Sequence, residues 1–508
     1  MIAAENGALP QGKVGGIGDV IRDLPGSLAD RGKRVTVITP AYGMFASLPG
    51  ARPVRQLSVE FGGRATEVAL FEVPGLDKRI THLVFDHLAF APGGLKQIYH
   101  DDGPDEPFKT DSSKFAFFCV CAANLLCQLR PDVVHLHDWH TGLLLALREY
   151  DNRFEALKTL RMCFTIHNLA MQGIRPFQGH EASLETWVPD NRYPRDVIGD
   201  PRYPDCFNPM LTAIRLADAV HTVSPTYAKE VCLPNRPGFH GGEGMEQALA
   251  DAREHGRLFG ILNGCAYAAR PKRKLGWKRL LKLCSAELTQ WIANDRWVSS
   301  AHLLATHRIP DFPTRRPGVV MTSVGRVTAQ KVQLFLQPTP AGPTALDLIL
   351  EHLGSDGVFI MLGSGDQALE QALTRTAARH ENFLFLKGYS DAIAHALYQA
   401  GDLFMMPSSF EPCGISQMLA MQAGQPCLVH AVGGLKDTVE HMQTGFVFSG
   451  DSPMQQAGQF VACTEKALQL RDREPSAFSK IRDQAAAARF TWDKAVAAYE
   501  KDLYDRNG

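Results

Sequence analysis

Short, continuously apolar segments alternate with longer helical patterns along most of the chain. Apolar runs of this length are typical of parallel strands covered on both faces. A first series of strands is expected at Val35–Thr39, Val133–His137, Cys163–His167 and Ala219–Val223, and a second at Val319–Val324, Val358–Leu362, Phe383–Leu386, Leu403–Met406 and Cys427–Ala431. The helical patterns include Val20–Arg31, Lys114–Leu129, Gln367–Arg379 and Ser416–Ala423. A non-periodic region around Asn263–Pro317 separates the two series. The alternation predicts two doubly wound α/β domains, with the ligand in a cleft where strand carboxyl ends meet helix amino ends.

The size and charge of the chain exclude several classes of protein. It has 508 residues, of which 45% are hydrophobic and 21% charged, which suits a globular protein and not a disordered, collagen-like or coiled-coil one. Lys and Arg total 53 against 54 Asp and Glu, so the formal net charge is -1. Without a basic excess, we expect no nucleic-acid partner and no anionic membrane partner.

The cysteines and the apolar stretches indicate a cytoplasmic protein. There are eleven cysteines, and none form a Cys-x-x-Cys pair, so reduced thiols are expected and not a disulfide framework or zinc knuckle. The chain begins without a basic and then apolar leader. Its most apolar stretch, Phe115–Leu129, contains two amides and is too short to span a bilayer.

Two motifs match known sites in part only. Gly7 to Lys13 has the spacing of a phosphate-binding P-loop, but Val14 stands where a Mg²⁺-binding hydroxyl is required and Pro10 removes a backbone donor. His135–His140 resembles the His-x-His-x-Asp-His ligand set of binuclear metal hydrolases, with Trp139 in the place of the required Asp. We therefore expect no metal site and no cofactor, and satisfied histidines at a strand end are the simpler interpretation.

Four further junctions place glycines or charges at strand ends. Their segments are Lys13–Asp19, Gly325–Lys331, Phe410–Ser416 and Val432–Val439. Glycine pairs at a helix start allow close approach of a phosphate or sugar, an Arg and Lys five residues apart suit a diphosphate, and a carboxylate at a helix start can bind hydroxyls. Each also has an ordinary explanation: a tight turn, a surface basic pair or a capping carboxylate.

Taken together, these and three other motifs resemble those of bacterial glycogen synthases and plant starch synthases. The motifs occur in the family's order, as Lys13-Val-Gly-Gly, His137-Asp-Trp-His-Thr, Thr165-Ile-His-Asn-Leu, Leu262-Asn-Gly, Arg326-x-Thr-x-Gln-Lys331, Phe410-Glu-Pro-Cys-Gly and Gly433-Gly-Leu-x-Asp-Thr-Val. The resemblance covers residues 5 to 504 and implies a GT-B fold of two Rossmann-like domains facing across a deep cleft. It implies an N-terminal acceptor-side domain over 1–262, a nucleotide-sugar domain over 263–485, and a C-terminal helix over 486–508 that packs back on the first domain.

The family's chemistry is retaining transfer of glucose from a nucleotide sugar to the non-reducing end of an α-1,4-glucan, with no metal. The resemblance implies ADP-glucose or UDP-glucose as donor, and leaves the choice and the oligomeric state open. It implies catalytic roles for Glu411, His167, Asp138, Arg326 and Lys331. It implies donor-binding roles for Lys13, Gly15, Gly16, Asp19, Asn263, Tyr389, Gly433 and Gly434.

The chain also departs from the family's motifs. Cys265 and Ala266 follow Asn263-Gly264 where Ile-Asp is usual, Val332 replaces a glycine, and Val432 replaces a hydroxyl residue before the paired glycines. No family position can be assigned over Ala266–Arg316. Two alternatives therefore stay open: a retaining GT-B transferase with a small acceptor, and a catalytically silent glucan-binding protein. A pyridoxal-phosphate phosphorylase is not indicated, because no lysine is marked for that cofactor.

Overall fold

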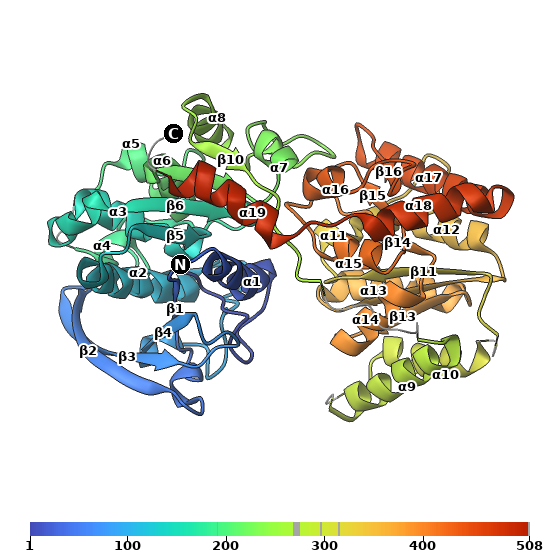
Figure 1. Ribbon diagram of the computed structural model, residues 1–508, viewed down its shortest axis with the longest axis horizontal. Coiled ribbons are helices and arrows are strands. Elements are labelled where there is room, and N and C mark those ends of the chain that lie inside the picture. Colours follow the sequence, from blue (N-terminus) through green and yellow to red (C-terminus); the bar gives the residue numbers. More distant parts are fainter. Residues whose placement is uncertain (190–191, 268–274, 295–296, 313–314, 506–508) are drawn as a thin grey trace. The chain divides into compact units, whose positions relative to one another are not determined.

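The chain forms two compact units. The computed structural model describes residues 1–189, 192–267, 275–294, 297–312 and 315–505. Unit 1 comprises Met1–Asn235, Gly241–Ala266 and the chain from Thr491 onward, and unit 2 comprises Arg236–His240 and Tyr267–Phe490. Apart from the short segment Arg236–His240, the chain changes unit after residues 266 and 490, where the sequence suggested 262 and 485. Figure 1 labels the elements of both units.

The sheet of unit 1 is built around the first residues of the chain. Its strands are β1 (Thr36–Pro40), β2 (Arg52–Phe61), β3 (Arg64–Val73), β4 (Thr81–Asp86), β5 (Val133–His137), β6 (Arg161–Ile166), β9 (Ala219–Thr222) and β10 (Leu258–Gly260). They run in the orders β1-β4-β3-β2 and β10-β9-β6-β5. Ile2 forms parallel bridges to Leu136 of β5 and to Ile38 of β1, and so joins the two rows. The predicted strands are present, with ends within two residues of those expected.

A long hairpin makes this sheet mixed, whereas the sequence predicted a parallel one. β2 and β3 pair antiparallel, and β3 also pairs antiparallel with β4. Gly62 and Gly63 turn the hairpin with φ of 60° and 68°, a geometry that favours two glycines between twisted strands. Most side chains of β2 are exposed, so this strand has no apolar run and was missed.

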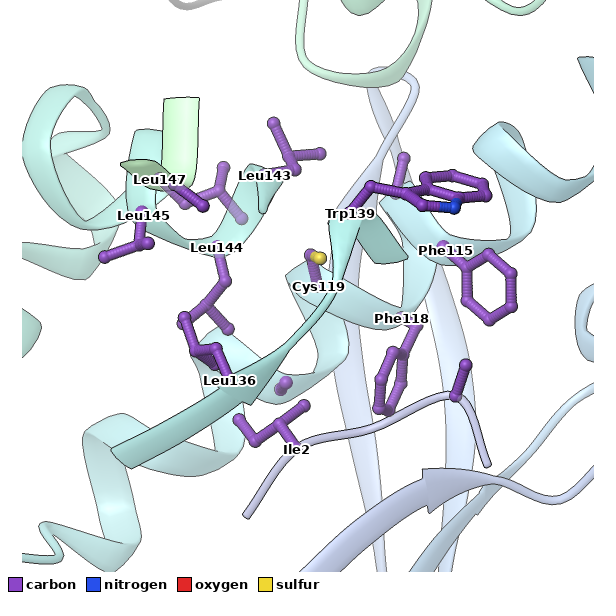
Figure 2. Close-up of a cluster of buried hydrophobic side chains, with 14 of the residues drawn as sticks. Ile2, Phe115, Phe118, Cys119, Leu136, Trp139, Leu143, Leu144, Leu145 and Leu147 are labelled. Atoms are coloured by element: carbon purple, nitrogen blue, oxygen red, sulfur yellow. The ribbon is translucent and has the colours of Figure 1, made fainter. Parts of the chain in front are cut away.

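The core of unit 1 forms around helix α2 (Lys109–Leu129). Figure 2 shows Cys119 of α2 between Leu136 of β5 and the leucines of α3 (Leu143–Tyr150), and Phe115 of α2 beside Trp139. By length and composition, α2 is the one helix among the described residues that could cross a membrane, and 72% of its apolar window is buried inside the protein. It begins upstream of the predicted apolar stretch, and its buried Lys114 pairs with Asp111 at 2.6 Å.

Shorter elements complete unit 1. They are α1 (Gly16–Asp30), α4 (Leu184–Trp187), α5 (Arg195–Ile198), α6 (Pro209–Leu216), α7 (Pro225–Glu230), α8 (Glu246–Glu254), η1 (Phe45–Ser47), η2 (Leu88–Phe90), η3 (Trp139–Thr141), η4 (Asn152–Thr159), and the strand pair β7 (Arg175–Pro176) and β8 (Cys206–Phe207).

The C-terminal segment packs in unit 1, against residues that are distant in sequence. It consists of α19 (Trp492–Ala498) and a π-helical turn, η5 (Tyr499–Tyr504). Trp492, Val496 and Tyr499 share a buried cluster with the apolar face of α1. Figure 1 shows α19, in red, among the blue and green elements of unit 1. The last helix is therefore part of the first unit's core.

Unit 2 holds a fully parallel sheet. Its strands are β11 (Val319–Val324), β12 (Gly357–Gly363), β13 (Phe383–Lys387), β14 (Leu403–Met406), β15 (Cys427–His430) and β16 (Gly445–Phe448), in the order β13-β12-β11-β14-β15-β16. The helices are α9 (Trp277–Asn294), α10 (Ser300–Asp311), α11 (Ala329–Leu336), α12 (Ala345–Leu353), α13 (Gln367–Arg379), α14 (Asp391–Ala400), α15 (Ser416–Gln422), α16 (Gly433–Thr438), α17 (Pro453–Arg473) and α18 (Pro475–Ala487). Two separate apolar clusters cover the sheet, as the continuous apolar strands predicted.

The region expected to be non-periodic contains two helices, α9 and α10. Trp277, Leu280, Cys284 and Leu288 of α9 are buried. These residues recur at helical spacing, so the expectation of a non-periodic region was wrong: the sequence carries the apolar pattern of a helix there. His302 of α10 donates to the end of β13, where its Nε2 lies 2.8 Å from the carbonyl oxygen of Lys387. Because that carbonyl can only accept, Nε2 carries the proton.

We predict that Gly264→Ala destabilises unit 1. A Cβ at Gly264 would lie 2.6 Å from the backbone Cα of Trp492, so α19 would have to shift. The expected loss is about 1–3 kcal/mol in free energy of unfolding, read from the thermal transition of unit 1. Gly26→Ala, inside α1, is the matched control, because its Cβ would meet only ordinary contacts and alanine favours a helix. Equal transitions for the two variants would contradict this packing.

Candidate active site

The topology of unit 2 selects which loops can form a site. From β11 the chain adds β12 and β13 on one side, and then β14, β15 and β16 on the other. Ligands of doubly wound sheets bind outside the strand carboxyl ends at such a reversal point. Here it lies between β11 and β14, which lead to Arg326–Lys331 and to Glu411.

Lys331 and Glu411 form an ion pair at this point. The Lys331 ammonium contacts Oε2 of Glu411, and the hydroxyl of Ser408 donates to the same oxygen at 3.1 Å. The side chains of Lys331 and Glu411 are 21% and 7% exposed, so the pair is largely withdrawn from water. Arg326 is exposed and makes no side-chain hydrogen bond or ion pair with any described residue. The site therefore has one paired cation and one available cation.

Hydrogen bonds to backbone carbonyls hold the three loops of this site together. Nε2 of Gln330 donates to the Phe410 carbonyl at 3.0 Å, and the Ser409 amide donates to the Gln330 carbonyl at 2.8 Å. The Gly434 amide donates to the Glu411 carbonyl at 3.0 Å. A Cβ at Gly434 would lie 2.3 Å from the carbonyl oxygen of Cys413, so glycine is required there. Gly434 thus contributes close packing, and its own N–H is already used. Gly433 precedes it with φ of 39°.

Tyr389 lies at a neighbouring strand end, after β13. The residue is 64% exposed and its hydroxyl donates to Asp391. The preceding Gly388 has φ of 157°, and a Cβ there would overlap the ring of Trp291 from α9. Helix α9 therefore packs directly behind the loop that carries Tyr389.

In unit 1 the corresponding reversal lies beside the strand of Ile2, which has β1 on one side and β5 on the other. This strand leads to Glu5, a residue that the sequence did not single out. The Glu5 carboxylate accepts hydrogen bonds from the amides of Val14, Gly15 and Gly18 at 2.8, 2.7 and 3.2 Å, and from the Tyr99 hydroxyl at 2.9 Å. Glu5 is 2% exposed, so these donors stabilise a buried carboxylate and fix the glycine loop.

The charged residues of the glycine loop are paired with one another. Lys13 contacts Asp19 at 2.8 Å, and Arg22 contacts Asp19 at 2.9 Å. Gly16 begins α1, and nothing lies within 4 Å of a Cβ placed on it, so a ligand can approach the backbone there. Gly15 differs, because its amide is held by Glu5.

Asp138 and His167 lie together at the ends of β5 and β6. Oδ1 of Asp138 accepts the His167 amide at 2.6 Å. Asp138 has φ of 55° and ψ of 180°, a backbone conformation that costs about 1–3 kcal/mol in a residue with a side chain. Burial raises the pKa of Asp138 to about 8, against the opposing effect of the two amides it accepts from. Burial also lowers the pKa of His167 to about 3, so its imidazole is neutral.

His135, the first histidine of the partial metal motif, is held by other side chains. Nδ1 of His135 lies 2.9 Å from the Tyr504 hydroxyl, and its Nε2 lies 2.6 Å from Oγ1 of Thr165. Both ring nitrogens of His135 are therefore used within the protein. Across the described residues, no group of three or more His, Cys, Asp and Glu side chains could hold a metal ion.

Asn263 follows β10 and is buried. The backbone amide of Asn263 donates to the Val223 carbonyl at 3.4 Å. Its side-chain oxygen, Oδ1, has no hydrogen-bond partner among the described residues. Thr328, between Arg326 and Lys331 in the sequence, also has a buried hydroxyl without a hydrogen-bond partner among the described residues. Unsatisfied buried oxygens are costly, and at a binding site a ligand can satisfy them.

Comparison with known proteins identifies the family. Residues 1–251 match the family described as "Starch synthase catalytic domain", and residues 319–466 match "Glycosyl transferases group 1". A glycogen synthase of Streptococcus gordonii is 32% identical over 99% of this chain and 98% of its own length. One from Anaeromyxobacter sp. is 33% identical over 97% of this chain and 96% of its own. The chain belongs to the glycogen synthase family.

Solved structures agree with the fold of this glycosyltransferase family. The catalytic domain of starch synthase IV from Arabidopsis thaliana, bound to ADP and acarbose, superposes with a TM-score of 0.73 and 25% identity over 99% of this chain and 97% of that one. Sucrose-phosphate synthase from Thermosynechococcus elongatus shares the fold, with a TM-score of 0.52 and 16% identity over 96% and 93%. The expectation of a GT-B fold and of a nucleotide-sugar glycosyltransferase is confirmed.

Three residues around the family motifs were missed from the sequence. Glu5 and Ser408 lie at strand ends beside motif residues, so position alone could have suggested them. His137 was noted as a possible metal ligand and as the start of a family motif, but without a role in the site, although its Nδ1 lies 3.0 Å from Nε2 of His167. Each of the three forms a hydrogen bond with a predicted site residue: Glu5 with Gly15, Ser408 with Glu411 and His137 with His167. The spacing of the motifs does not show these contacts.

We predict that Asp138→Asn changes how stability depends on pH. The pKa of Asp138 is about 8 in the folded protein and near 3.8 when unfolded, so between these values only the folded state holds the proton. Stability that this group contributes is present at low pH and is lost as pH rises from about 4 to about 8. Asparagine has no such proton, so the variant gains about 1–3 kcal/mol relative to the wild type between pH 5 and pH 8.

Thermal unfolding of both proteins across this pH range measures the difference. The surrounding groups are the same in both, so they cancel in the comparison. A difference between variant and wild type that stays constant with pH would show that Asp138 is ionised throughout.

Proposed function

We propose that this glycogen synthase family member transfers glucose, with retention, from ADP-glucose to the non-reducing end of an α-1,4-glucan. The observation that carries the proposal is the Lys331–Glu411 ion pair beside the available Arg326 at the reversal point of unit 2. The printed ligands of the Arabidopsis relative, ADP and acarbose, support an adenine nucleotide and a glucan-like acceptor. We also propose a cytoplasmic location, because all eleven cysteines are free thiols.

In this proposal Arg326 and Lys331 stabilise the diphosphate as it leaves. Breaking the bond from glucose to phosphate places negative charge on the phosphate oxygens, and cations fixed in advance lower that barrier. Lys331 is held in place by Glu411 and by the start of α11, so little reorganisation is needed. The Thr328 hydroxyl lies between the two cations in sequence and can donate to the same group.

Glu411 holds and orients the donor glucose. One of its oxygens receives Lys331 and Ser408, which leaves the other for sugar hydroxyls. Gly433 and Gly434 bring the start of α16 against this loop, and Tyr389 is proposed to contact the nucleoside. This assignment makes unit 2 the nucleotide-sugar domain.

In unit 1, His167 and Asp138 are proposed to serve the sugar. The neutral imidazole of His167 can donate a hydrogen bond to a sugar oxygen, and Asp138 fixes the backbone on which His167 stands. Lys13, Asp19, Gly15 and Gly16 form the loop proposed to meet the donor, and Asn263 offers its unsatisfied oxygen. No metal is needed in this scheme, because the cations of unit 2 meet the leaving charge.

The test is incorporation of labelled glucose from ADP-glucose, and in parallel from UDP-glucose, into glycogen and short maltooligosaccharides. We expect incorporation from ADP-glucose, product that an α-1,4-specific amylase releases, and an unchanged rate when a chelator is added. Donor binding without transfer to either glucan would point to a small acceptor. Failure to bind either donor would favour a silent glucan-binding protein, and inhibition by the chelator would contradict the metal-free scheme.

We predict that Lys331→Ala and Glu411→Ala each lower kcat by about 10²–10³-fold, because each removes a charge that acts on the reacting groups. The folded fraction should be retained, since Lys331 at the start of α11 and Glu411 in the loop after β14 both lie outside the apolar clusters. Arg379→Ala is the matched control. It breaks an ion pair of 2.6 Å to Asp347 in the same unit, away from the proposed site.

Steady-state rates of the three variants, with circular dichroism to check folding, decide the matter. Activity within a few-fold of the wild type in Lys331→Ala or Glu411→Ala would remove the role given to that residue. Arg379→Ala should keep nearly the full rate.

A further inference from the structure

A directed chain of hydrogen bonds crosses the centre of unit 1. Nε2 of His221 lies 3.0 Å from the carbonyl oxygen of Ile261, which can only accept, so this nitrogen carries the proton. Because the pKa of His221 is lowered to about 4 by burial, the ring is neutral and its Nδ1 accepts. Nδ1 therefore receives the Thr165 hydroxyl at 2.9 Å.

The same logic continues to the C-terminal turn. The hydroxyl hydrogen of Thr165 is used in the hydrogen bond to His221, so Oγ1 of Thr165 accepts a hydrogen bond from Nε2 of His135 at 2.6 Å. Burial lowers the pKa of His135 as well, so its Nδ1 is unprotonated and accepts from the Tyr504 hydroxyl at 2.9 Å. One carbonyl thus determines the tautomers of two histidines, and both nitrogens of His135 are occupied.

His137 lies between this chain and His167. Its ring stacks on His135 with centroids 4.3 Å apart, and its Nδ1 lies 3.0 Å from Nε2 of His167. His137 is fully buried, and its Nε2 has no hydrogen-bond partner among the described residues. His135 cannot supply one, because its nitrogens are already used.

Two tautomers of the His137–His167 pair are possible. If Nε2 of His167 donates, then the proton of His137 stays on its buried Nε2 as an unpaired N–H. If Nδ1 of His137 donates, the buried Nε2 keeps only a lone pair. Unpaired buried N–H groups are rarer in proteins than unpaired buried acceptors, so the second arrangement is favoured. The pKa of His137 is lowered well below its ordinary value by burial, which leaves a single proton to place.

We propose that His137 is a positioning residue that holds His167 in the tautomer protonated at Nδ1. Nδ1 of His167 has no partner among the described residues, and the side chain is only half-buried. Its N–H then donates to an oxygen of the donor sugar. This last step rests on the proposed function, whereas the tautomer does not.

The first measurement is ¹⁵N NMR of the resting full chain labelled at histidine. The His167 signals are identified by their loss in His167→Gln. We expect a protonated Nδ1 and an unprotonated Nε2 in His167 of the wild type. A protonated Nε2 would overturn the proposal, whether or not the protein transfers glucose, so a failure of the proposed function is read separately from a failure of this one.

The second measurement compares His137→Asn with His137→Leu, two side chains of similar branched shape. Asparagine can place an N–H where Nδ1 of histidine was, and leucine cannot. We expect His137→Asn to keep kcat within about 3-fold and to keep the His167 tautomer. We expect His137→Leu to lose about 10–100-fold in kcat with little change in KM, and to show mixed tautomers.

Equal rates for the two variants would overturn the role of His137. If His137→Leu does not fold, the wild-type tautomer and the rate of His137→Asn still decide, because a loss of more than 100-fold in the asparagine variant contradicts the proposal.

Discussion

The direction in which a parallel sheet is wound determines where its loops can gather. In unit 2 the winding reverses between β11 and β14, and in unit 1 it reverses beside the strand of Ile2. Strand carboxyl ends on either side of such a point are not covered by the same crossover, so their loops stay accessible. Lys331 and Glu411 follow the two strands at the first point. Glu5 and Asp138 follow two neighbouring strands at the second. The strand order alone therefore brings the candidate residues of each unit to the same edge of its sheet, whatever contacts their side chains make.

Once the loops are gathered, buried charge has to be stabilised. Glu5 is satisfied by three amides and a phenol, Glu411 by an ammonium and a hydroxyl, and Asp138 by amides of the segment after β6. Burial raises the pKa of Asp138, because it outweighs the two amide contacts of this carboxylate. The nearby His137 and His167 carry no charge that needs stabilising, because burial lowers their pKa and their rings remain neutral. The polar interior of unit 1 is thus a set of donors and acceptors with fixed directions, which suits hydrogen bonding to a neutral sugar.

Much of this could be predicted from the sequence, because apolar periodicity reports burial directly. Strands such as β5 and β11 and helix α13 have the predicted bounds, since their apolar runs face a core. The hairpin β2–β3 was missed because its exposed side chains carry no such signal, and α9 was missed although its apolar residues recur at helical spacing. In the site, motif residues were found where glycine or charge stands out at a strand end. The roles of Glu5 and His137 could not be found in this way, even though Glu5 lies at a strand end, since these roles depend on contacts with residues distant in sequence.

The charges of the unit 2 site indicate which ligand it suits. Arg326 and Lys331 carry two positive charges and Glu411 one negative charge, so the group has a net charge of about +1. A diphosphate can add to this group without displacing Glu411, because Arg326 makes no ion pair with any described residue. Val432, which caps α16 without a side-chain hydrogen bond, supplies no hydroxyl to the phosphates. In the proposed scheme the binding of the diphosphate thus depends on the two cations, and Lys331 connects it to Glu411, the group proposed to hold the sugar. In such an arrangement the departure of the diphosphate and the orientation of the glucose depend on the same lysine.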